Sequence, residues 1–269
     1  MLKFAKGHAY GNDFLYVRAA DVAGATLDAL ARELCDRHTG VGADGLIGYE
    51  EAAGDVAMRL MNADGSRAEV SGNGVRALGA LLLQHDGALD AAIDIRTEAG
   101  VKRVSRTGRD GSRQVFRTAM GPPRDVRKIL PIEIAGESIH PVVLDMGNPQ
   151  CVILGPLPTD AVFRRVGAAL ERHELFPEGT NVEFAEVESP DLVRILIWER
   201  GVGPTASSGT GSCGALVAAA SFGGAAHDAD VVAPGGTQRV DWRADGVYLT
   251  GWAEVLFEGE WLRQIPRTS

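Results

Sequence analysis

The chain has 269 residues, of which 45% are hydrophobic and 23% charged, and this composition excludes a disordered protein. The formal net charge of −9 and the lack of a basic stripe exclude a nucleic-acid-binding surface, which needs clustered Lys and Arg. No apolar run approaches the length of about 18 residues that reads as a membrane span, and the N-terminus carries no secretory signal. We therefore expect a cytoplasmic protein without membrane or nucleic-acid partners.

The first part of the chain begins with a strand pair, because a Gly11-Asn12 turn precedes the apolar run 14–17. Apolar residues at helical spacing predict a helix over 27–37. A second, apolar helix is predicted over 75–84, directly after a loop of Ser71, Gly72, Asn73 and Gly74. Short β-branched runs bounded by turn residues predict strands over 56–61, 92–96, 103–105 and 113–119.

The same features return in the same order later in the chain. Gly147-Asn148 repeats the Gly11-Asn12 turn and precedes the apolar run 151–154. Arg172-His173 repeats Arg37-His38, and each pair closes a predicted helix, the later one over 160–172. A second Ser-Gly loop, residues 208–211, repeats the first and precedes an apolar helix over 212–220. Further strands are predicted over 192–198, 229–233, 238–242, 247–250 and 253–258.

These matches lie at nearly one offset, which is close to half the chain length, and therefore indicate a duplicated unit. We expect an α/β (α+β) fold of two pseudo-symmetric halves. Each half is predicted to be a barrel-like, mostly antiparallel sheet around a central helix, with the active site in the cleft between the halves. The predicted halves are residues 1–121 and 122–269, and the C-terminal strand is free to return to the first half.

The two Ser-Gly loops are candidate binding elements. A loop of small residues at the start of a helix directs backbone N–H groups to one point, where the helix dipole favours an anion such as a carboxylate. Glycine also allows close approach of a ligand and unusual φ/ψ values. Ser71 and Ser208 could equally be ordinary N-caps. Two copies at equivalent places favour a shared site over two unrelated caps.

Eight short blocks are spread over nearly the whole chain. They are 11–14 (GNDF), 35–45 (CDRHTGVGADG), 62–66 (NADGS), 72–74 (GNG), 147–149 (GNP), 180–184 (TNVEF), 199–203 (ERGVG) and 209–211 (GTG). Together and in this order they resemble the signature blocks of the diaminopimelate epimerase family.

The resemblance implies cofactor-independent inversion at the α-carbon of an amino acid, with LL- and meso-diaminopimelate as the usual pair. It also implies a small-molecule amino-acid partner, lysine and peptidoglycan precursor biosynthesis, and a homodimer. Carried over by position, backbone N–H groups of Gly72, Asn73, Gly74, Gly209 and Thr210 would hold the reacting carboxylate. The distal part of the substrate would be held by Asn12, Asn62, Asn148, Asn181 and Arg200. Arg200 suits a carboxylate, which it can contact with two parallel hydrogen bonds.

The chain departs from the family at its acid–base positions. The family uses two cysteines, one at the start of each loop, to move a proton from one face of the α-carbon to the other. Ser71 and Ser208 stand at these positions, and Gln150 stands where the family has a histidine that assists the first cysteine. Glu199, the carboxylate beside the second position, is retained.

A serine hydroxyl is a poor base, because it lacks the accessible pKa of a thiol and needs a neighbouring base. Glu199 is the candidate partner of Ser208, whereas Gln150 takes no proton. Cys151 and Cys213 do not replace the missing thiols, since they fall in an apolar strand and the apolar helix and are interpreted as core residues. The count of three cysteines, without metal-ligand spacing, predicts neither a disulfide framework nor a metal site.

Three interpretations stay open. The protein is an epimerase or related isomerase in which Ser71 and Ser208 relay protons. Alternatively, it binds an amino acid and performs other α-carbon chemistry, such as dehydration or one-sided proton exchange with Glu199 as base. In the third interpretation it is a non-catalytic binding protein, or a chain whose cysteines were replaced in order to trap a complex.

Overall fold

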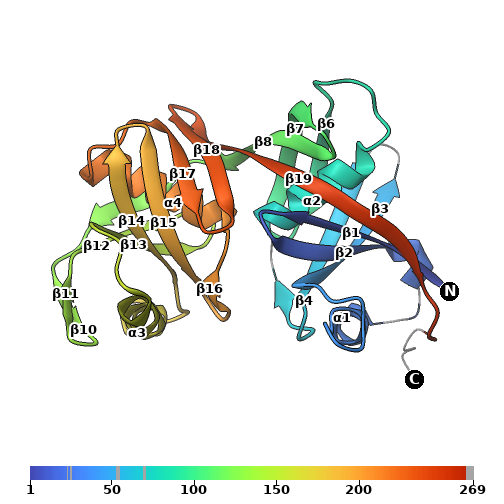
Figure 1. Ribbon diagram of the computed structural model, residues 1–269, viewed down its shortest axis with the longest axis horizontal. Coiled ribbons are helices and arrows are strands. Elements are labelled where there is room, and N and C mark those ends of the chain that lie inside the picture. The colour runs from blue at the N-terminus through green and yellow to red at the C-terminus, as the bar shows by residue number, and fades with distance from the viewer. Residues whose placement is uncertain (23, 25, 53–54, 69–70, 265–269) are drawn as a thin grey trace. The chain divides into compact units, whose positions relative to one another are not determined.

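The computed structural model describes residues 1–264 apart from 23, 25, 53, 54, 69 and 70 (Figure 1). It divides into two compact units: Met1–Thr118 with Trp252–Ser269 form unit 1, and Ala119–Gly251 form unit 2. The last strand, β19 (Gly246–Trp261), belongs to both, because Gly246–Thr250 pair with unit 2 and Glu254–Trp261 pair with β1 (Leu2–Ala9) of unit 1.

Unit 1 is a mostly antiparallel sheet. Its neighbouring strands follow the order β1-β2-β3-β4-β6-β7-β8, with parallel pairing only at β2–β3 and β4–β6. The strand β8 also pairs with β19, and β19 pairs with β1, so β19 joins the last strand of this order to the first. The strands are β2 (Asn12–Arg18), β3 (Gly45–Ala52), β4 (Asp55–Asn62), β5 (Arg67–Ala68), β6 (Ala92–Thr97), β7 (Gly100–Asp110) and β8 (Arg113–Gly121).

The core of unit 1 is the helix α2 (Gly72–Leu82), around which these strands pack. Leu78 of α2 is fully buried in one cluster with Tyr16, Ile47 and Phe116 from three strands. The amphipathic helix α1 (Leu27–Leu34) covers the sheet elsewhere, with Leu30 and the other apolar residues of its inner face in a separate cluster. A short 3₁₀ helix, Ala19–Val22, precedes it.

Unit 2 has the same plan. Its strands follow the order β12-β13-β14-β15-β17-β18-β19, again with only the second and fourth pairings parallel. The strands are β9 (Arg124–Lys128), β12 (Pro141–Asp145), β13 (Pro149–Leu154), β14 (Asn181–Ser189), β15 (Leu192–Glu199), β16 (Gly203–Thr205), β17 (Asp228–Ala233) and β18 (Gly236–Arg243). A separate hairpin consists of β10 (Ile132–Ile134) and β11 (Glu137–Ile139).

The central helix of unit 2 is α4 (Gly209–Phe222), in which all residues from Gly211 to Ala219 are buried. A helix that is apolar on all sides is typical of a position inside a core. The helix α3 (Asp160–Glu171) packs outside, with Phe163, Val166 and Leu170 against the sheet. The shared strand order and pairing directions confirm two pseudo-symmetric α/β halves.

The duplication also holds in register. In unit 1, Phe14 pairs with Gly45 and Tyr16 with Ile47. At the equivalent places of unit 2, Gln150 pairs with Asn181 and Val152 with Glu183. Phe14 and Ile47 of unit 1 therefore have Gln150 and Glu183 as their counterparts in unit 2.

Predicted bounds were wrong for the first helix and for two C-terminal strands. The first helix ends at Leu34 rather than at residue 37, because Asp36 Oδ1 accepts hydrogen bonds from the backbone N–H groups of His38 and Thr39 and forms a turn there. The expected strands 247–250 and 253–258 are one strand, β19, which changes its pairing partner near Gly251 without a turn.

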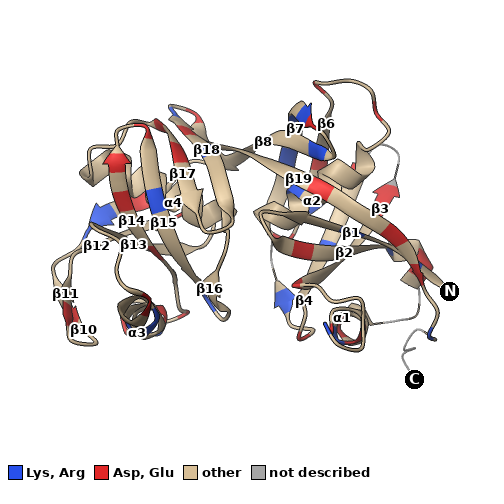
Figure 2. Ribbon diagram, viewed as in Figure 1, with Lys and Arg blue, Asp and Glu red and all other residues tan. Residues whose placement is uncertain are grey.

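Acidic and basic residues are scattered over both units, and the basic residues do not gather in one stripe in this view (Figure 2). Among the described residues, no helix is long and apolar enough to cross a membrane.

Candidate active site

Both predicted loops open a central helix, and in both the serine is the N-cap. Ser71 has an extended backbone (φ −126°, ψ 121°), and its hydroxyl accepts a hydrogen bond of 3.2 Å from the N–H of Gly74. Ser208 repeats this geometry (φ −137°, ψ 130°) and accepts from the N–H of Gly211 at 3.1 Å. Each hydroxyl thus satisfies one of the N–H groups that a helix N-terminus leaves without a partner inside the helix.

The final glycine of each loop, Gly74 or Gly211, is needed for packing. None of Gly72, Gly74, Gly209 and Gly211 has positive φ, so the expectation of unusual backbone angles there was wrong. A Cβ on Gly74 would lie 2.8 Å from Ile47 Cδ1. A Cβ on Gly211 would lie 2.7 Å from Glu183 Oε1 and 3.1 Å from Ser208 Oγ. The final glycine of each loop lets a side chain from the sheet approach the first turn of the helix.

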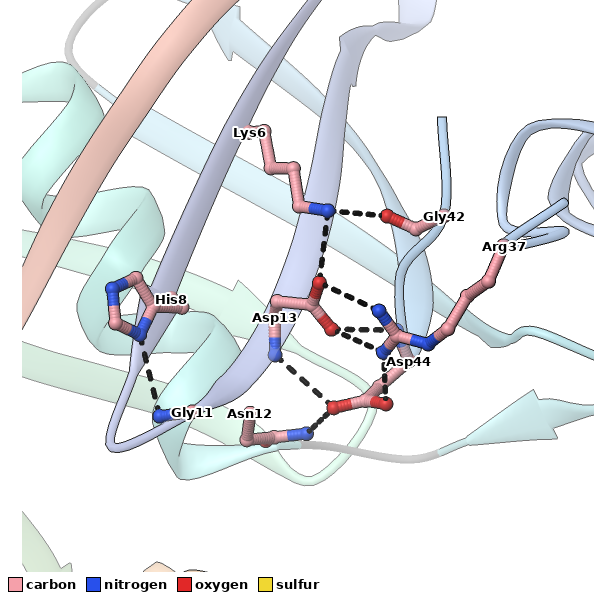
Figure 3. A network of polar contacts seen from close by, with 8 residues as sticks. All are labelled: Lys6, His8, Gly11, Asn12, Asp13, Arg37, Gly42 and Asp44. Carbon is pink, nitrogen blue, oxygen red and sulfur yellow. Dashed lines mark hydrogen bonds and ion pairs between the residues drawn. The ribbon is translucent and has the colours of Figure 1, made fainter. Parts of the chain in front are cut away.

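Asn12 is held by an ionic network in unit 1 (Figure 3). Its Nδ2 donates to Asp44 Oδ2 at 2.8 Å, and the same oxygen accepts from the N–H of Asp13 at 3.1 Å. Arg37 Nη2 bridges Asp44 Oδ1 at 2.8 Å and Asp13 Oδ1 at 2.7 Å, and Lys6 Nζ lies 3.0 Å from Asp13 Oδ2. These cations hold the pKa of Asp13 below its usual range although its burial acts in the opposite direction.

The network fixes which end of the Asn12 amide faces the first loop. Because Nδ2 is bonded to a carboxylate, Oδ1 faces Asn73, whose Nδ2 donates to it at 3.3 Å. Asn73 Oδ1 in turn accepts from Arg76 of α2. Asn12 therefore presents an acceptor beside the loop. Its partners Asp13, Arg37 and Asp44 stand within the family-like blocks, but their sequence positions did not indicate this role.

Asn62 forms the turn that leads to the first loop. Its Nδ2 donates to Ser66 Oγ at 2.9 Å and its N–H donates to Ser66 O at 2.8 Å. Gly65, with φ +82°, completes the turn. The structure gives Asn62 a turn-forming contact, and its contact with a substrate stays a prediction.

In unit 2, Asn148 lies beside the second loop, with Nδ2 3.4 Å from Thr210 Oγ1. Asn181 is more fully engaged, since its Nδ2 donates to Pro149 O at 3.1 Å and its Oδ1 accepts from the N–H of Arg200 at 3.0 Å. Arg200 is exposed, and its Nη1 donates to Glu178 O at 3.1 Å. The direct contacts of Asn181 are internal, and it fixes the backbone that carries Arg200.

Gln150 and Glu183 form a buried polar pair beneath α4, and both side chains are fully buried. The Gln150 amide lies between two polar neighbours, with one end 2.9 Å from Glu183 Oε1 and 3.2 Å from Oε2 and the other end 2.6 Å from Asn148 Oδ1. Burial and the nearby Glu199 carboxylate raise the pKa of Glu183 well above its usual range. Glu183 was not among the predicted site residues. The sequence feature that could have indicated it is a carboxylate between the apolar residues Val182 and Phe184 of a buried strand.

The cysteines take no part in either loop. All three are buried, and Cys151 and Cys213 lie in apolar clusters. Burial raises the pKa of Cys35 to about 12 and raises that of Cys151 further. Among the described residues, no group of three His, Cys, Asp or Glu side chains is placed to hold a metal ion.

Comparison with known proteins now decides the family. A family model described as diaminopimelate epimerase matches residues 4–126 and 142–256. The chain belongs to the diaminopimelate epimerase family. A protein of that name from Desulforudis audaxviator is 40% identical over 97% of this chain and 100% of its own length. Another, from Desulfovibrio desulfuricans, is 36% identical over 97% of this chain and 98% of its own.

Solved structures share the fold at low identity. A predicted epimerase from Pseudomonas aeruginosa has a TM-score of 0.76 at 16% identity, covering 98% of this chain and 100% of its own. A phenazine biosynthesis protein of the PhzF family from Bacillus anthracis has a TM-score of 0.70 at 16% identity, covering 97% and 99%. These likenesses show a shared fold and no more.

A substitution tests the contact between Glu183 and the second loop. We expect Gly211→Ala to destabilise the protein by about 1–3 kcal/mol, because the new methyl group must displace the Glu183 carboxyl from a packed site. The same substitution combined with Glu183→Ala should cost less than the sum of the two single changes. Urea unfolding of the single and double variants measures this coupling.

Gly87→Ala is the matched control, since nothing lies within 4 Å of a Cβ there and we expect a change within about 0.5 kcal/mol. Additive effects of Gly211→Ala and Glu183→Ala would show that the close approach is not a real constraint.

Proposed function

We propose that the protein is a cofactor-independent isomerase of the diaminopimelate epimerase type, which interconverts LL- and meso-diaminopimelate. The similarity to relatives of that name over almost the whole chain carries this proposal. The paired helix starts support it, because each offers a positive N-terminus to a carboxylate and a hydroxyl at the N-cap.

The reaction needs two groups that exchange protons with the α-carbon from opposite faces. We assign these positions to Ser71 and Ser208. Each hydroxyl already accepts a backbone N–H, which leaves its own proton available for donation. The same N–H bond and the helix dipole stabilise the negative oxygen that forms when that proton leaves. Glu199 is proposed as the carboxylate that assists Ser208.

Asn12 supplies a specificity element. Since its Oδ1 faces Asn73 and its Nδ2 is held by Asp44, it accepts rather than donates a hydrogen bond. We propose that it binds an ammonium group of the substrate. Arg200, Asn62, Asn148 and Asn181 stay assigned to the distal end of the substrate, where an Arg guanidinium suits a carboxylate.

A second candidate function has an observation in its favour. The polar pair Gln150–Glu183 lies beneath the second loop, whereas the counterpart positions beneath the first loop hold Phe14 and Ile47. Such asymmetry favours proton exchange on one face only, with retention of configuration or with elimination of water. The two candidates differ in stereochemical outcome.

Three finer features follow from the family resemblance and stay proposals: the reaction uses no pyridoxal phosphate, the protein works in the cytoplasm, and it is a homodimer. Analytical ultracentrifugation measures the last of these directly.

Incubation of diaminopimelate in D2O distinguishes the candidates. Deuterium incorporation at the α-carbon with inversion is the expected result for the epimerase, and incorporation with retention or loss of water favours the second candidate. Absence of any exchange, together with calorimetric binding of diaminopimelate, would contradict both and leave a binding protein.

Restoring thiols should raise the rate. We expect the variant with Ser71→Cys, Ser208→Cys and Gln150→His to exchange the α-proton at least about 10²-fold faster, because a thiolate forms near neutral pH and an alkoxide does not. A rate equal to that of the unaltered protein would show that diaminopimelate is not the substrate.

Asp44→Asn tests the orientation of Asn12. An amide at position 44 no longer specifies which end of Asn12 faces the loop, so affinity for diaminopimelate should fall about 10-fold, a loss of about 1.4 kcal/mol. Calorimetry should show a smaller loss for an analogue that lacks one amino group. Asp55→Asn, at a carboxylate whose side chain is 77% exposed, is the control and should bind normally. Equal losses for both ligands would contradict an ammonium contact at Asn12.

A further inference from the structure

The two units differ at one pair of positions beneath their central helices. Phe14 and Ile47 of unit 1 correspond in register to Gln150 and Glu183 of unit 2. Ile47 Cδ1 and Phe14 Cε2 lie 2.8 and 3.6 Å from where a Cβ of Gly74 would stand. Glu183 Oε1 takes the place of Ile47 at the second loop, 2.7 Å from the corresponding point on Gly211.

The fold does not require polar residues at these positions. Unit 1 shows that an apolar pair fits the same strands, register and helix start. Burial of an ionisable group carries a free-energy cost that an apolar pair avoids. The polar pair of unit 2 is therefore retained for something other than stability.

The surroundings of Glu183 favour its neutral form. Its burial, and the Glu199 carboxylate of β15, which repels a second negative charge, both favour a proton on Glu183. The strand β13 contributes no charge here, only the Gln150 amide and the buried Cys151 thiol. The helix α4 contributes no charged side chain, since its first residues are Gly, Thr and Ser. A carboxyl group whose surroundings favour the protonated form thus lies beside the loop that carries Ser208.

We propose that Glu183, held by the Gln150 amide, supplies a proton to Ser208 of the second loop and takes it back in the reverse direction. We call Glu183 the proton reserve of this loop. This inference rests on the proposed function. When Ser208 Oγ gives its proton to the α-carbanion, a Cα–H bond forms and the Oγ–H bond breaks. The Glu183 carboxylic acid, which lies with Ser208 Oγ around the same point at Gly211, then passes its proton to Ser208 Oγ and becomes a carboxylate beside the Gln150 amide. In the reverse direction the α-proton goes to Ser208 Oγ, and the hydroxyl proton returns to Glu183.

Glu183→Gln keeps the shape and removes the proton. We expect deuterium wash-in at the α-carbon of diaminopimelate to fall at least about 10²-fold. In the direction in which Ser208 donates, the rate should fall as pH rises and Glu183 ionises. Measured for both epimers, at least one profile of the unaltered protein should have this alkaline limb, and Glu183→Gln should lack it. Glu188→Gln, on the same strand but exposed and paired with Arg194, should change the rate less than about two-fold.

Transfer of the unit 1 pair provides a second variant. We expect Gln150→Phe with Glu183→Ile to melt at the same or a higher temperature and yet to lose wash-in. Activity within about three-fold of the unaltered protein would overturn the inference, because the pair would then have no role in proton transfer.

Difference infrared spectra of the unaltered protein and Glu183→Gln at neutral pH test the protonation state without turnover. The carbonyl stretch of a protonated carboxyl should be present only in the former, and its absence would overturn the inference. Lack of wash-in by the unaltered protein would contradict the proposed function. Wash-in that Glu183→Gln retains would contradict the proton reserve alone.

Discussion

The start of a buried helix is the constraint on which both units depend. The helices α2 and α4 lie inside their sheets, so their first N–H groups cannot all rely on bulk water. In each unit a serine hydroxyl satisfies one of these groups, and the remaining positive end suits a carboxylate. The cap and the proposed acid–base group are therefore the same atom.

Beneath this common plan the two units differ in polarity. One helix start packs against Phe14 and Ile47, and the other against Gln150 and Glu183. A strict repeat would give both loops the same chemistry, whereas only the second loop lies beside a buried carboxyl group. The polar network of Lys6, Arg37 and Asp44 lies outside this core and acts on Asn12 instead.

The sequence predicted the duplicated plan well, because repeated motifs at one offset and apolar helices after each loop depend on local patterns. It failed at one local turn, and elsewhere where a contact between distant segments decides the outcome. Asp36 ends α1 early through its own turn, and β19 continues through Gly251 because a new strand is there to pair with it. The sequence did not predict a role for Glu183, because only the register of β13 and β14 places it beside Gln150 and the second loop. The direction of the Asn12 amide likewise depends on Asp44, which is distant in the sequence.

The central claim is that both helix starts bind one amino-acid substrate through backbone N–H groups. Titration of ¹⁵N-labelled protein with meso-diaminopimelate tests it most directly, by following the amide resonances of Gly72, Asn73, Gly209 and Thr210. We expect all four to shift with one common midpoint, while the amide of Gly111 in a surface turn does not move. Shifts confined to one loop, or different midpoints for the two loops, would contradict a single substrate held by both.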